Sequence, residues 1–337
     1  MSSPNLSRVR IYDVANAAGV SIATASKALN GTGRMAVETR DRIERIAAEL
    51  GFRPNALARG LISRRSFTVG LLTNDTYGRF TLPVMAGVSE ALVDHGVSVF
   101  LCTIGNDPEL GKVHVDAMLD KQVDGIIATG KRIDHRLPVD LADLPIPVVY
   151  AFTGAPEDAV QLVSDDAQGS REAVEWLARL GRSHIVHVTG PGSFASVHER
   201  AGAFRDVAGA DAPVLYGEWS EAWGHRAVAQ IWEDRARPPD GIFCGNDQIA
   251  RGVVDALRER GVDVPGAVSV VGFDNWELVA AATRPPLTTV DMNLKDLGRE
   301  AGRLILALAE GKQVAPGLRR MACRLVVRQS CGGAPAP

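Results

Sequence analysis

The sequence has 337 residues, 46% of them hydrophobic and 23% charged, with a formal net charge of −3. This length suits two or three domains, and the composition excludes a disordered or low-complexity chain. The charge is uneven, because residues 1–66 hold eleven Lys and Arg against five Asp and Glu, whereas the remainder holds 26 against 35. A basic segment ahead of an acidic body is expected where only that segment contacts nucleic acid.

Two short helices around a tight turn are predicted at the start of the chain, over about 11–18 and 22–29. The apolar residues of the first repeat at helical spacing, at Ile11, Val14, Ala15 and Ala18. Gly19 ends this helix because glycine adopts the left-handed conformation easily, and Ser21 is placed to cap the second helix. Such a pair forms a helix-turn-helix, whose second helix fits the DNA major groove. The alternative is an ordinary helical hairpin packed in a core.

The second helix has one apolar side, formed by Ala25, Ala28 and Leu29, which leaves Ile22, Ala23, Ser26 and Lys27 to face outward. A third helix is predicted over about 37–50, with an apolar stripe at Val37, Ile43, Ile46, Ala47 and Leu50. A connector follows over 54–66. Its residues 55–61 are long enough for about two helical turns, and a helix this short forms only when something else holds it.

From Phe67 onward, short apolar runs alternate with amphipathic segments. Strands are predicted over 68–72, 98–103, 125–129, 148–150, 185–189, 214–216, 241–244 and 268–272. Helices are predicted over 81–95, 109–121, 168–180, 196–208, 221–233 and 247–260. This alternation predicts an α/β fold of two similar lobes, each a doubly wound parallel sheet with helices on both faces, and a ligand at the carboxyl ends of the strands, between the lobes.

No pattern indicates secretion, a membrane span, a metal site or catalysis. The four cysteines are scattered without CxxC spacing, at Cys102, Cys244, Cys323 and Cys331. The N-terminus lacks an apolar signal core, and no apolar stretch approaches the ~18 residues that span a bilayer. His184 and His187 fall on one predicted strand but face opposite sides. We therefore predict a cytoplasmic protein that is not an enzyme and that binds neither a metal nor a cofactor.

Two sets of sequence motifs resemble the lactose-repressor/galactose-repressor family of bacterial transcription regulators. The N-terminal set is DVANAAGVSIATASKALNG (13–31), ETRDRI (38–43) and LGFRPNALARGL (50–61). The second set is VGLL (69–72), VDGII (123–127), CGNDQIARGV (244–253), SVVGFDN (269–275), RPPLTTVDMN (284–293) and CRLVVRQS (323–330). The resemblance covers nearly the whole chain.

The resemblance implies a three-helix DNA-binding head, a hinge helix and a two-lobed core like that of periplasmic binding proteins. We assign the head to 1–53, the hinge helix and linker to 54–66, the effector-binding and dimerisation core to 67–331, and a disordered tail to 332–337. Within the core we expect an N-lobe of about 67–164 plus 287–318, and a C-lobe of about 165–286 plus 319–331.

The resemblance also assigns DNA contacts. Bases are read in the major groove by Ile22, Ala23 and Lys27, while the DNA backbone is contacted by Tyr12, Thr24, Ser26, Asn30 and Arg34. Lys27 can donate to guanine, but arginine is commoner there in the family, and the loss of its two-pronged donor weakens base discrimination. Arg10 replaces the usual Ser or Thr cap of the first helix.

Hinge contacts in the minor groove fall to Ala58, Arg59 and Leu61. Leu61 aligns with a leucine that family members wedge between base pairs, and Ala58 allows two hinge helices to approach closely. The alternative is that Leu61 anchors the linker on the core.

For the effector, the resemblance implies a polar set, Arg200, Asn246 and Asp274, and an aromatic, Trp219, that stacks on a sugar ring. We add Tyr77, Phe80 and Trp276 as candidate walls of the cleft. Trp219 and Trp223 could instead belong to the core, and Asp247 could be a helix N-cap. Lys131 and Arg132 either favour an acidic sugar or form a solvated loop. The segment 75–81 lacks the family's usual Asn-Pro-Phe-Phe-like string, so ligand choice is not transferred.

These observations predict an effector-controlled, sequence-specific DNA-binding regulator, a repressor that binds a pseudo-palindromic operator as a homodimer. A sugar or sugar derivative between the lobes alters its affinity for double-stranded DNA. A dimer is expected because the C-terminus has no heptad pattern. The alternative is a solute-binding protein of the same two-lobed fold, which would need an export signal and no basic head.

Overall fold

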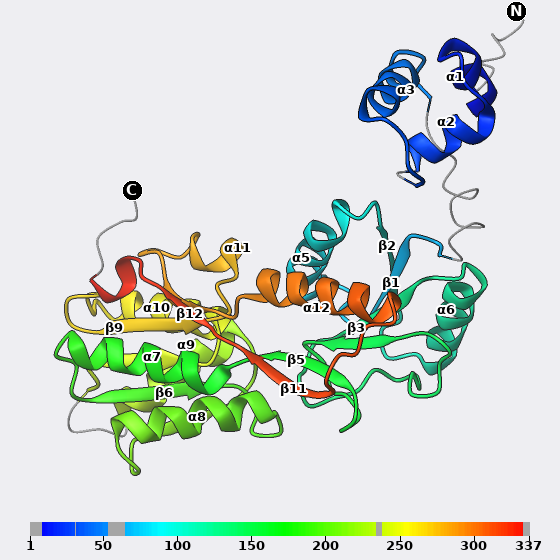
Figure 1. Cartoon of the computed structure of the whole chain (residues 1–337). Helices are drawn as coiled ribbons and strands as arrows, with labels where there is room; N and C mark the ends of the chain where they lie inside the picture. The colour runs from blue at the N-terminus through cyan, green and yellow to red at the C-terminus, as the bar shows by residue number, and fades with distance from the viewer. Residues whose placement is uncertain (1–8, 31, 53–64, 234–237, 333–337) are drawn as a thin grey trace, which may run out of the picture. The chain divides into compact units, whose positions relative to one another are not determined.

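The computed structural model describes residues 9–30, 32–52, 65–233 and 238–332 (Figure 1). The hinge candidates Ala58, Arg59 and Leu61 lie outside the described residues, as does nearly all of the expected tail. The chain divides into two compact units. One comprises the residues up to Thr68 with the short segment Lys121–Val123, and the other comprises the rest of the chain.

The first unit holds the predicted head helices, α1 (Ile11–Ala17), α2 (Ile22–Leu29) and α3 (Val37–Glu49). Their small core is formed by the side chains of Val14, Ala15, Ala18, Ala25, Ala28, Ile43 and Ala47. Gly19 has a φ of 63° between α1 and α2, and the Ser21 hydroxyl accepts a 3.1 Å hydrogen bond from the Thr24 amide, so the predicted turn and cap are confirmed. Val37 and Leu50 were wrongly expected in the apolar stripe: Val37 begins α3 and is 73% exposed, and Leu50 follows its last residue and is 39% exposed.

The first lobe of the core is a six-stranded sheet in the order β11-β5-β4-β3-β1-β2. The strands are β1 (Thr68–Thr73), β2 (Ser98–Thr103), β3 (Gly125–Thr129), β4 (Val148–Ala151), β5 (Val160–Ser164) and β11 (Gly317–Met321). The helices of this lobe are α5 (Thr81–Val93), α6 (Pro108–Asp120) and α12 (Leu294–Ala309). Neighbouring strands from β1 through β3, β4 and β5 to β11 are parallel, as predicted for a doubly wound sheet.

The second lobe is a six-stranded sheet in the order β12-β10-β9-β8-β6-β7. The strands are β6 (Ile185–Thr189), β7 (Val214–Tyr216), β8 (Gly241–Cys244), β9 (Ser269–Phe273), β10 (Thr288–Asp291) and β12 (Arg324–Val326), which alone of the described pairs runs antiparallel to its neighbour. The helices are α7 (Asp166–Arg179), α8 (Ala195–Ala208), α9 (Glu221–Glu233), α10 (Asp247–Glu259) and the short α11 (Glu277–Ala280), followed by the 3₁₀ turn Gln329–Cys331.

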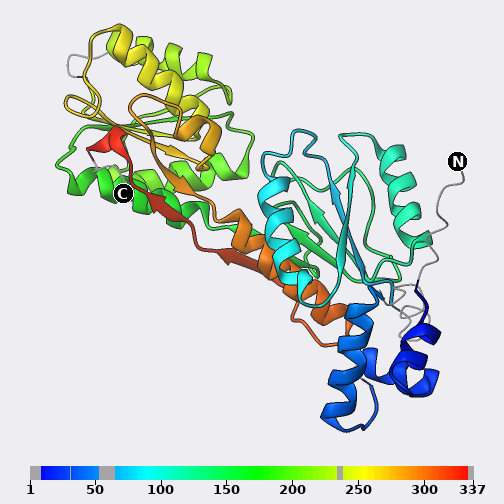
Figure 2. The ribbon, with the colours of Figure 1, turned by 90° about the horizontal axis from the view of Figure 1, so that it is seen from above.

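The chain crosses between the lobes after β5, after β10 and after β11 (Figure 2). The expected ends of the segment that returns to the first lobe, residues 287 and 318, were therefore both wrong. β10 belongs to the second sheet, so the return segment of the first lobe starts near α12 rather than at residue 287. β11 pairs with β5 through Met321, so that segment ends beyond the expected residue 318.

Helices α5 and α12 pack unusually closely on the first lobe. A Cβ atom added at Gly87 would lie 1.8 Å from the Lys295 carbonyl oxygen, and one at Gly298 would lie 2.0 Å from the Val84 carbonyl oxygen. These two glycines fix the seam between the helices and hence the position of the loop that leads into α5. No helix in the described part of the chain has the length and apolar character that crossing a membrane requires.

Candidate functional site

The outward face of α2 carries the residues expected to read bases. Ile22 is 49% exposed, and Ala23 and Lys27 are also exposed, because Ala25 and Ala28 on the other side of the helix are buried in the core of the head. The prediction of which side of α2 faces outward is confirmed. An exposed aliphatic pair beside an ammonium group can contact a thymine methyl group and donate to guanine.

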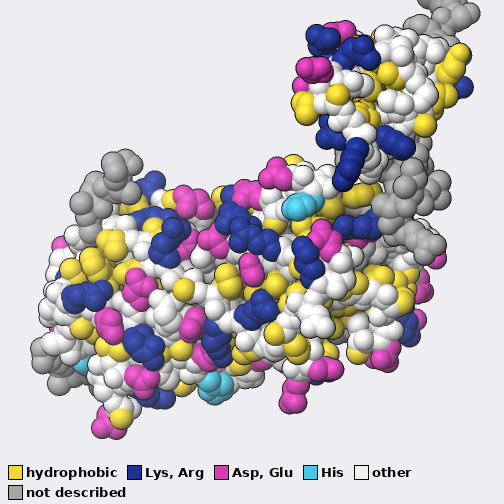
Figure 3. All heavy atoms as spheres, in the orientation of Figure 1, with side chains coloured by type: hydrophobic (Ala, Val, Ile, Leu, Met, Phe, Trp, Pro, Cys, Tyr) yellow, Lys and Arg dark blue, Asp and Glu magenta, His cyan; other side chains and the backbone are white. Residues whose placement is uncertain are grey.

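The residues expected to contact the DNA backbone lie around this face. Tyr12, Asn30 and Arg34 are exposed, and Thr24 and Ser26 are half-buried. Asn30 donates to the Ser26 hydroxyl at 3.2 Å, and the Ser21 and Thr24 hydroxyls lie 2.8 Å apart. Figure 3 shows Lys and Arg side chains on the visible face of the head. Exposed hydroxyl, amide and guanidinium groups of this kind contact phosphates and fix the register of a protein on a duplex.

Arg10 replaces a capping Ser or Thr, and the structure shows how the helix start is nevertheless satisfied. The Asp13 carboxylate accepts a 2.7 Å hydrogen bond from the Arg10 amide, which caps α1 from inside the helix. The Arg10 residue itself is exposed. The Asp13 carboxylate therefore satisfies the amide of the N-cap residue, while a positive side chain that cannot accept a hydrogen bond stands where a Ser or Thr would cap the helix.

In the core, a cavity of about 280 Å³ lies between the two lobes. Five of the seven effector candidates line it: Phe80, Arg200, Trp219, Asn246 and Asp274. It is also lined by Arg79, Lys131, Arg132, Ile133, Phe152, Asp166, Phe194, Ser196 and Met292. Each lobe contributes a pair of rings, since the Phe80 and Phe152 centroids are 5.1 Å apart and those of Phe194 and Trp219 are 5.6 Å apart.

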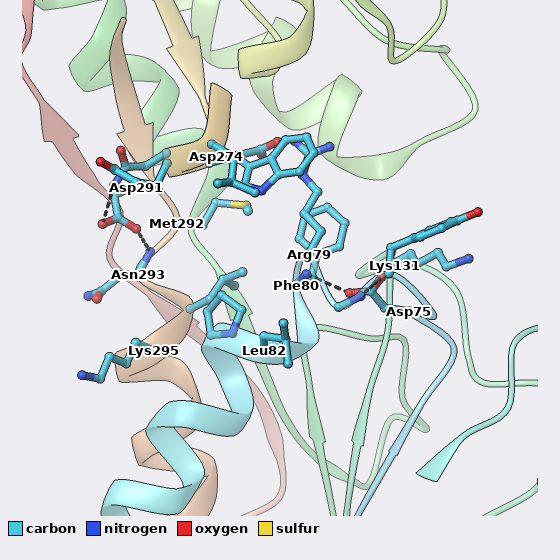
Figure 4. Close-up of a pocket in the computed structure, with 18 of the residues that line it drawn as sticks. Asp75, Arg79, Phe80, Leu82, Lys131, Asp274, Asp291, Met292, Asn293 and Lys295 are labelled. Atoms are coloured by element: carbon cyan, nitrogen blue, oxygen red, sulfur yellow. Dashed lines mark hydrogen bonds and ion pairs between the residues drawn. The ribbon is translucent and has the colours of Figure 1, made fainter. Parts of the chain in front are cut away.

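The other two effector candidates line a neighbouring, larger cavity of about 860 Å³ (Figure 4). Tyr77 is 92% exposed and does not line the smaller cavity, so its side chain is not a wall there. Trp276 is half-buried, and its amide donates to the Asp247 carboxylate at 2.7 Å. The two cavities share several lining residues, namely Arg79, Phe80, Lys131, Asp274 and Met292.

Arg200 is held in place by buried protein groups. Its Nη2 and Nε atoms donate to Asp166 Oδ2 at 2.9 and 3.1 Å, and its Nη1 donates to the Gly245 carbonyl oxygen. The guanidinium carbon lies 3.7 Å from the Phe273 ring centroid, and Asp274 Oδ1 is 3.8 Å from Nη1. The side chains of Arg200 and Asp166 are 5% and 1% exposed, so the fork is fixed in one orientation before any ligand binds.

Asn246, not Asp247, caps α10. The Asn246 side chain accepts a 2.8 Å hydrogen bond from the Ile249 amide, so the expectation that Asp247 is the cap was wrong. The fully buried Asp247 carboxylate instead accepts from the Thr289 hydroxyl at 2.5 Å and from the Trp276 amide. Burial, together with the nearby negative charge of Asp274, raises the pKa of Asp247 to about 8.

Asp247 should make core stability depend on pH. Its folded pKa is raised above the unfolded value, so its contribution is fully present below about pH 4 and is lost as the pH rises through about 8. Asp247→Asn mimics the neutral acid and is expected to be more stable than wild type by a few kcal/mol near pH 8, with little difference near pH 4. Urea unfolding followed by tryptophan fluorescence tests this, because all five tryptophans lie in the core.

The matched control is Asp116→Asn, which removes an exposed carboxylate of α6. It should change stability little at either pH. Parallel stability curves for wild type and Asp247→Asn from pH 4 to pH 9 would contradict the prediction.

The two candidate tryptophans of the second lobe have different surroundings. Trp223 is 6% exposed in the core and donates from Nε1 to the Thr189 carbonyl oxygen at 2.9 Å, so the core alternative holds for it. Trp219 is half-buried, packs on the same core and presents a face to the smaller cavity. A flat indole face of this kind suits the C–H side of a sugar ring.

Arg132 is not a solvated loop residue. It donates to Asp134 at 2.9 and 2.7 Å and to the Ser193 carbonyl oxygen at 2.7 Å, and its guanidinium carbon lies 3.7 Å from the Phe194 ring centroid. The hydrogen bond from Arg132 lowers the pKa of Asp134 to about 2. The charge of Arg132 is therefore already neutralised, whereas Lys131 is exposed at the edge of both cavities.

The sequence interpretation missed Arg79. Its Nη2 pairs with the Asp274 carboxylate, and its Nη1 donates to Gln248 Oε1 at 2.9 Å. Burial raises the pKa of Asp274, although Arg79 and Arg200 both lower it. The only available signal was a cation in the loop that follows the first predicted strand of the core, where parallel sheets place ligand-binding residues.

His187 and the cysteines do not form a metal site among the described residues. His187 is fully buried, its Nδ1 lies 2.9 Å from the Phe243 carbonyl oxygen, and burial lowers its pKa to about 3. The ring is therefore neutral and stacked on Phe243, with centroids 4.6 Å apart. All four cysteines are buried thiols.

Two family models match the chain. Residues 10–55 match the model described as bacterial regulatory proteins, lacI family, and residues 174–331 match the model of a periplasmic binding protein-like domain. The first match covers all three head helices. The second covers most of the second lobe and the segments that return to the first.

Curated relatives and solved structures match over nearly the whole chain. Catabolite control protein A of Priestia megaterium is 31% identical over 96% of this chain and 99% of the relative, and the HTH-type transcriptional repressor CytR of Escherichia coli (strain K12) is 30% identical over 96% of each. The lac repressor dimer bound to operator and the anti-inducer ONPF has a TM-score of 0.73 and 27% identity, with 96% and 99% coverage. The complex of the regulator CelR with cellobiose has a TM-score of 0.66 and 28% identity, covering 96% and 100%.

Proposed function

This chain belongs to the LacI family of bacterial regulatory proteins, and on that premise we propose that it is a homodimeric repressor of a pseudo-palindromic operator, controlled by a small effector between its lobes. Its relatives are transcriptional regulators rather than enzymes, and so is this chain. The observation that carries the proposal is the exposed face of α2, where Ile22, Ala23 and Lys27 lie on the helix that a helix-turn-helix inserts into the major groove.

The proposed DNA contacts follow from the chemistry of the head. Lys27 donates to guanine, and Ile22 and Ala23 contact thymine methyl groups. Tyr12, Thr24, Ser26, Asn30 and Arg34 bind phosphates and set the register, and Ala58, Arg59 and Leu61 act in the minor groove. Two such heads related by a twofold axis read the two halves of a symmetric site. The similar structure of the lac repressor dimer bound to operator supports this arrangement.

The proposed effector is a small sugar or sugar derivative in the 280 Å³ cavity. This volume is at the lower end of ligand pockets. Trp219 supplies a flat face for a pyranose, and Asp274 and Asn246 supply groups that can bind neighbouring hydroxyls. The related complex of CelR with cellobiose supports this class of ligand for the family, and the particular sugar is the object of the test below.

Control follows from the connection between the lobes. The chain crosses from one lobe to the other three times within the described core, and we propose that a change in the angle between the lobes alters the spacing of the two connectors in a dimer. A ligand that prefers one angle thus alters DNA affinity, and DNA must alter effector affinity by the same factor. A protein that acts on chromosomal DNA works in the cytoplasm, which is where we place it.

The competing function, a solute-binding protein, uses the same two-lobed core. The match of residues 10–55 to a bacterial regulatory family argues against it, because a solute carrier has no use for an exposed recognition helix. The two functions differ in their response to salt. Affinity for DNA should fall steeply with ionic strength, whereas affinity for a neutral sugar should not.

The test is a selection of genomic fragments with purified full-length protein, followed by fluorescence anisotropy on the enriched site and on a scrambled duplex. We expect at least about 1,000-fold preference for the enriched site. A thermal-shift screen with a sugar panel identifies the effector, since a ligand at 100 times its Kd stabilises the protein by about 2.7 kcal/mol. Equal affinity for the enriched and scrambled duplexes would refute the proposal.

A further inference from the structure

Arg79 connects the two lobes at the smaller cavity, which it lines together with the cavity's polar groups. It follows β1 of the first lobe, and both of its hydrogen-bonding partners belong to the second lobe. Its Nη2 pairs with Asp274, which follows β9, and its Nη1 donates to Gln248 of α10 at 2.9 Å. The side chains of Arg79 and Asp274 are 17% and 7% exposed. Figure 4 shows Arg79 reaching across toward Asp274.

Rings from both lobes surround this guanidinium. Its carbon lies 4.6 Å from the ring centroid of Trp276 in the second lobe and 5.1 Å from that of Phe80 in the first. Both distances are within the range of cation–π attraction. The guanidinium therefore has charge, hydrogen-bond and ring partners that are brought together only when the lobes are close.

The ion pair also lies on the boundary of the two cavities. Arg79 and Asp274 line both the 280 Å³ and the 860 Å³ cavity, and Arg79 approaches Asp274 from the opposite lobe. Phe80, Lys131 and Met292 also line both cavities, so the ion pair forms one part of this boundary. Withdrawal of Arg79 would open that part and expose the Asp274 carboxylate to a molecule in the cleft.

One hydrogen-bond donor of the Arg79 side chain is not satisfied by these contacts within the described residues. Arg79 Nε is buried and has no hydrogen-bond partner among the described residues. We call the contacts of Arg79 with the second lobe the clamp. A buried donor without an acceptor costs free energy, so the clamp does not recover the full cost of burying the guanidinium. A ligand that satisfies Asp274 more completely can therefore displace Arg79.

We propose that Arg79 is an internal ligand of the cleft, which occupies Asp274 and holds the lobes closed until an effector displaces it. The identity of the displacing ligand rests on the proposed function, whereas the clamp itself does not. A hydroxyl group that binds Asp274 must compete with the guanidinium already there. If the clamp is about 90% populated, it lowers the apparent affinity of the effector about tenfold.

The experiment measures lobe closure in the absence of DNA and effector. Cysteines placed at Val113 of α6 and Ala208 of α8, both exposed and in different lobes, carry spin labels, while the four native cysteines are buried. Labelled chains are diluted in unlabelled protein so that each assembly carries one pair. Wild type should give one narrow distance distribution, and Arg79→Ala should give a longer and broader one.

Chemical rescue makes the test specific. Ethylguanidinium replaces the atoms removed in Arg79→Ala and, at low millimolar concentration, should restore the narrow distribution in that variant without changing wild type. Arg226→Ala is the matched control, because it removes an exposed guanidinium that pairs with Glu218 within the second lobe. It should keep the wild-type distances and show no response to ethylguanidinium.

Arg79→Met keeps an unbranched apolar stem in place of the charged side chain, and it serves if Arg79→Ala does not fold. An unchanged distance distribution in the folded variant, or an equal ethylguanidinium response in Arg226→Ala, would overturn the clamp. Loss of the clamp with specific DNA binding intact leaves the proposed function standing. Conversely, a clamp found in a protein without DNA specificity refutes only the proposed function.

Discussion

Lys27→Glu is expected to weaken binding to the selected operator by about 100-fold or more, with no loss of helix content. A good contact between a cation and guanine contributes about 1–3 kcal/mol, a dimer makes it twice, and the introduced carboxylate adds repulsion from the phosphates. The fold should tolerate the change because Lys27 is exposed on α2, opposite the buried Ala25 and Ala28. Anisotropy titrations on operator and scrambled DNA, with circular dichroism for the fold, measure both effects.

Arg45→Glu is the matched control for this variant. It makes the same charge change on an exposed position of α3, outside the proposed base-reading face. Its binding should fall only by the general electrostatic effect, about tenfold or less at physiological salt. If both variants lost operator affinity equally, α2 would not be the recognition helix.

The sequence predicted most of the elements whose apolar pattern is strong, but it missed the buried strand β5 and the amphipathic helix α12. Eight core strands have at most one residue that is not buried, and the six of them that were predicted have short apolar runs, as in β3 and β9. β11 was missed because its sequence, GLRRM, has two adjacent arginines and its side chains are only partly buried at an edge of the first sheet. β10, of sequence TTVD, was missed because its buried residues are mainly threonines.

The positions of the site residues were predicted well where a local pattern and the family resemblance agreed. Asn246 caps α10, Asp274 directly follows β9, Arg200 lies in the second turn of α8, and all three line one cavity. The choice of cap between Asn246 and Asp247 could not be made from sequence, because both residue types cap helices well. Only the packing of Asp247 against Thr289 distinguishes them.

Interactions between distant residues could not be predicted at all. Arg79 pairs with Asp274, 195 positions later in the chain, and Arg132 reaches Ser193 across the lobes. In neither case does the sequence pattern around the arginine indicate which distant residue it contacts. Such contacts depend on how two separately folded lobes meet, which is also what an effector is proposed to change.

Arg200→Met is expected to destabilise the core by about 3–5 kcal/mol and to abolish the response of DNA binding to the effector. The stability loss arises because Asp166, which is 1% exposed, is left with a buried negative charge and only the Ser164 hydroxyl as a side-chain partner among the described residues. The loss of response arises because the polar end of the effector cavity loses its fixed donor. Urea unfolding by tryptophan fluorescence and effector-dependent anisotropy measure the two effects separately.

The double variant Asp166→Asn/Arg200→Met separates structure from ligand binding. Removing both charges takes away the unpaired carboxylate, so most of the lost stability should return, as often happens when a whole buried ion pair is replaced. The effector response should stay absent, because the donor at the cavity is still missing. A double variant no more stable than Arg200→Met would mean that the pair does not carry the destabilisation. A double variant that responds to the effector like wild type would mean that Arg200 is structural only.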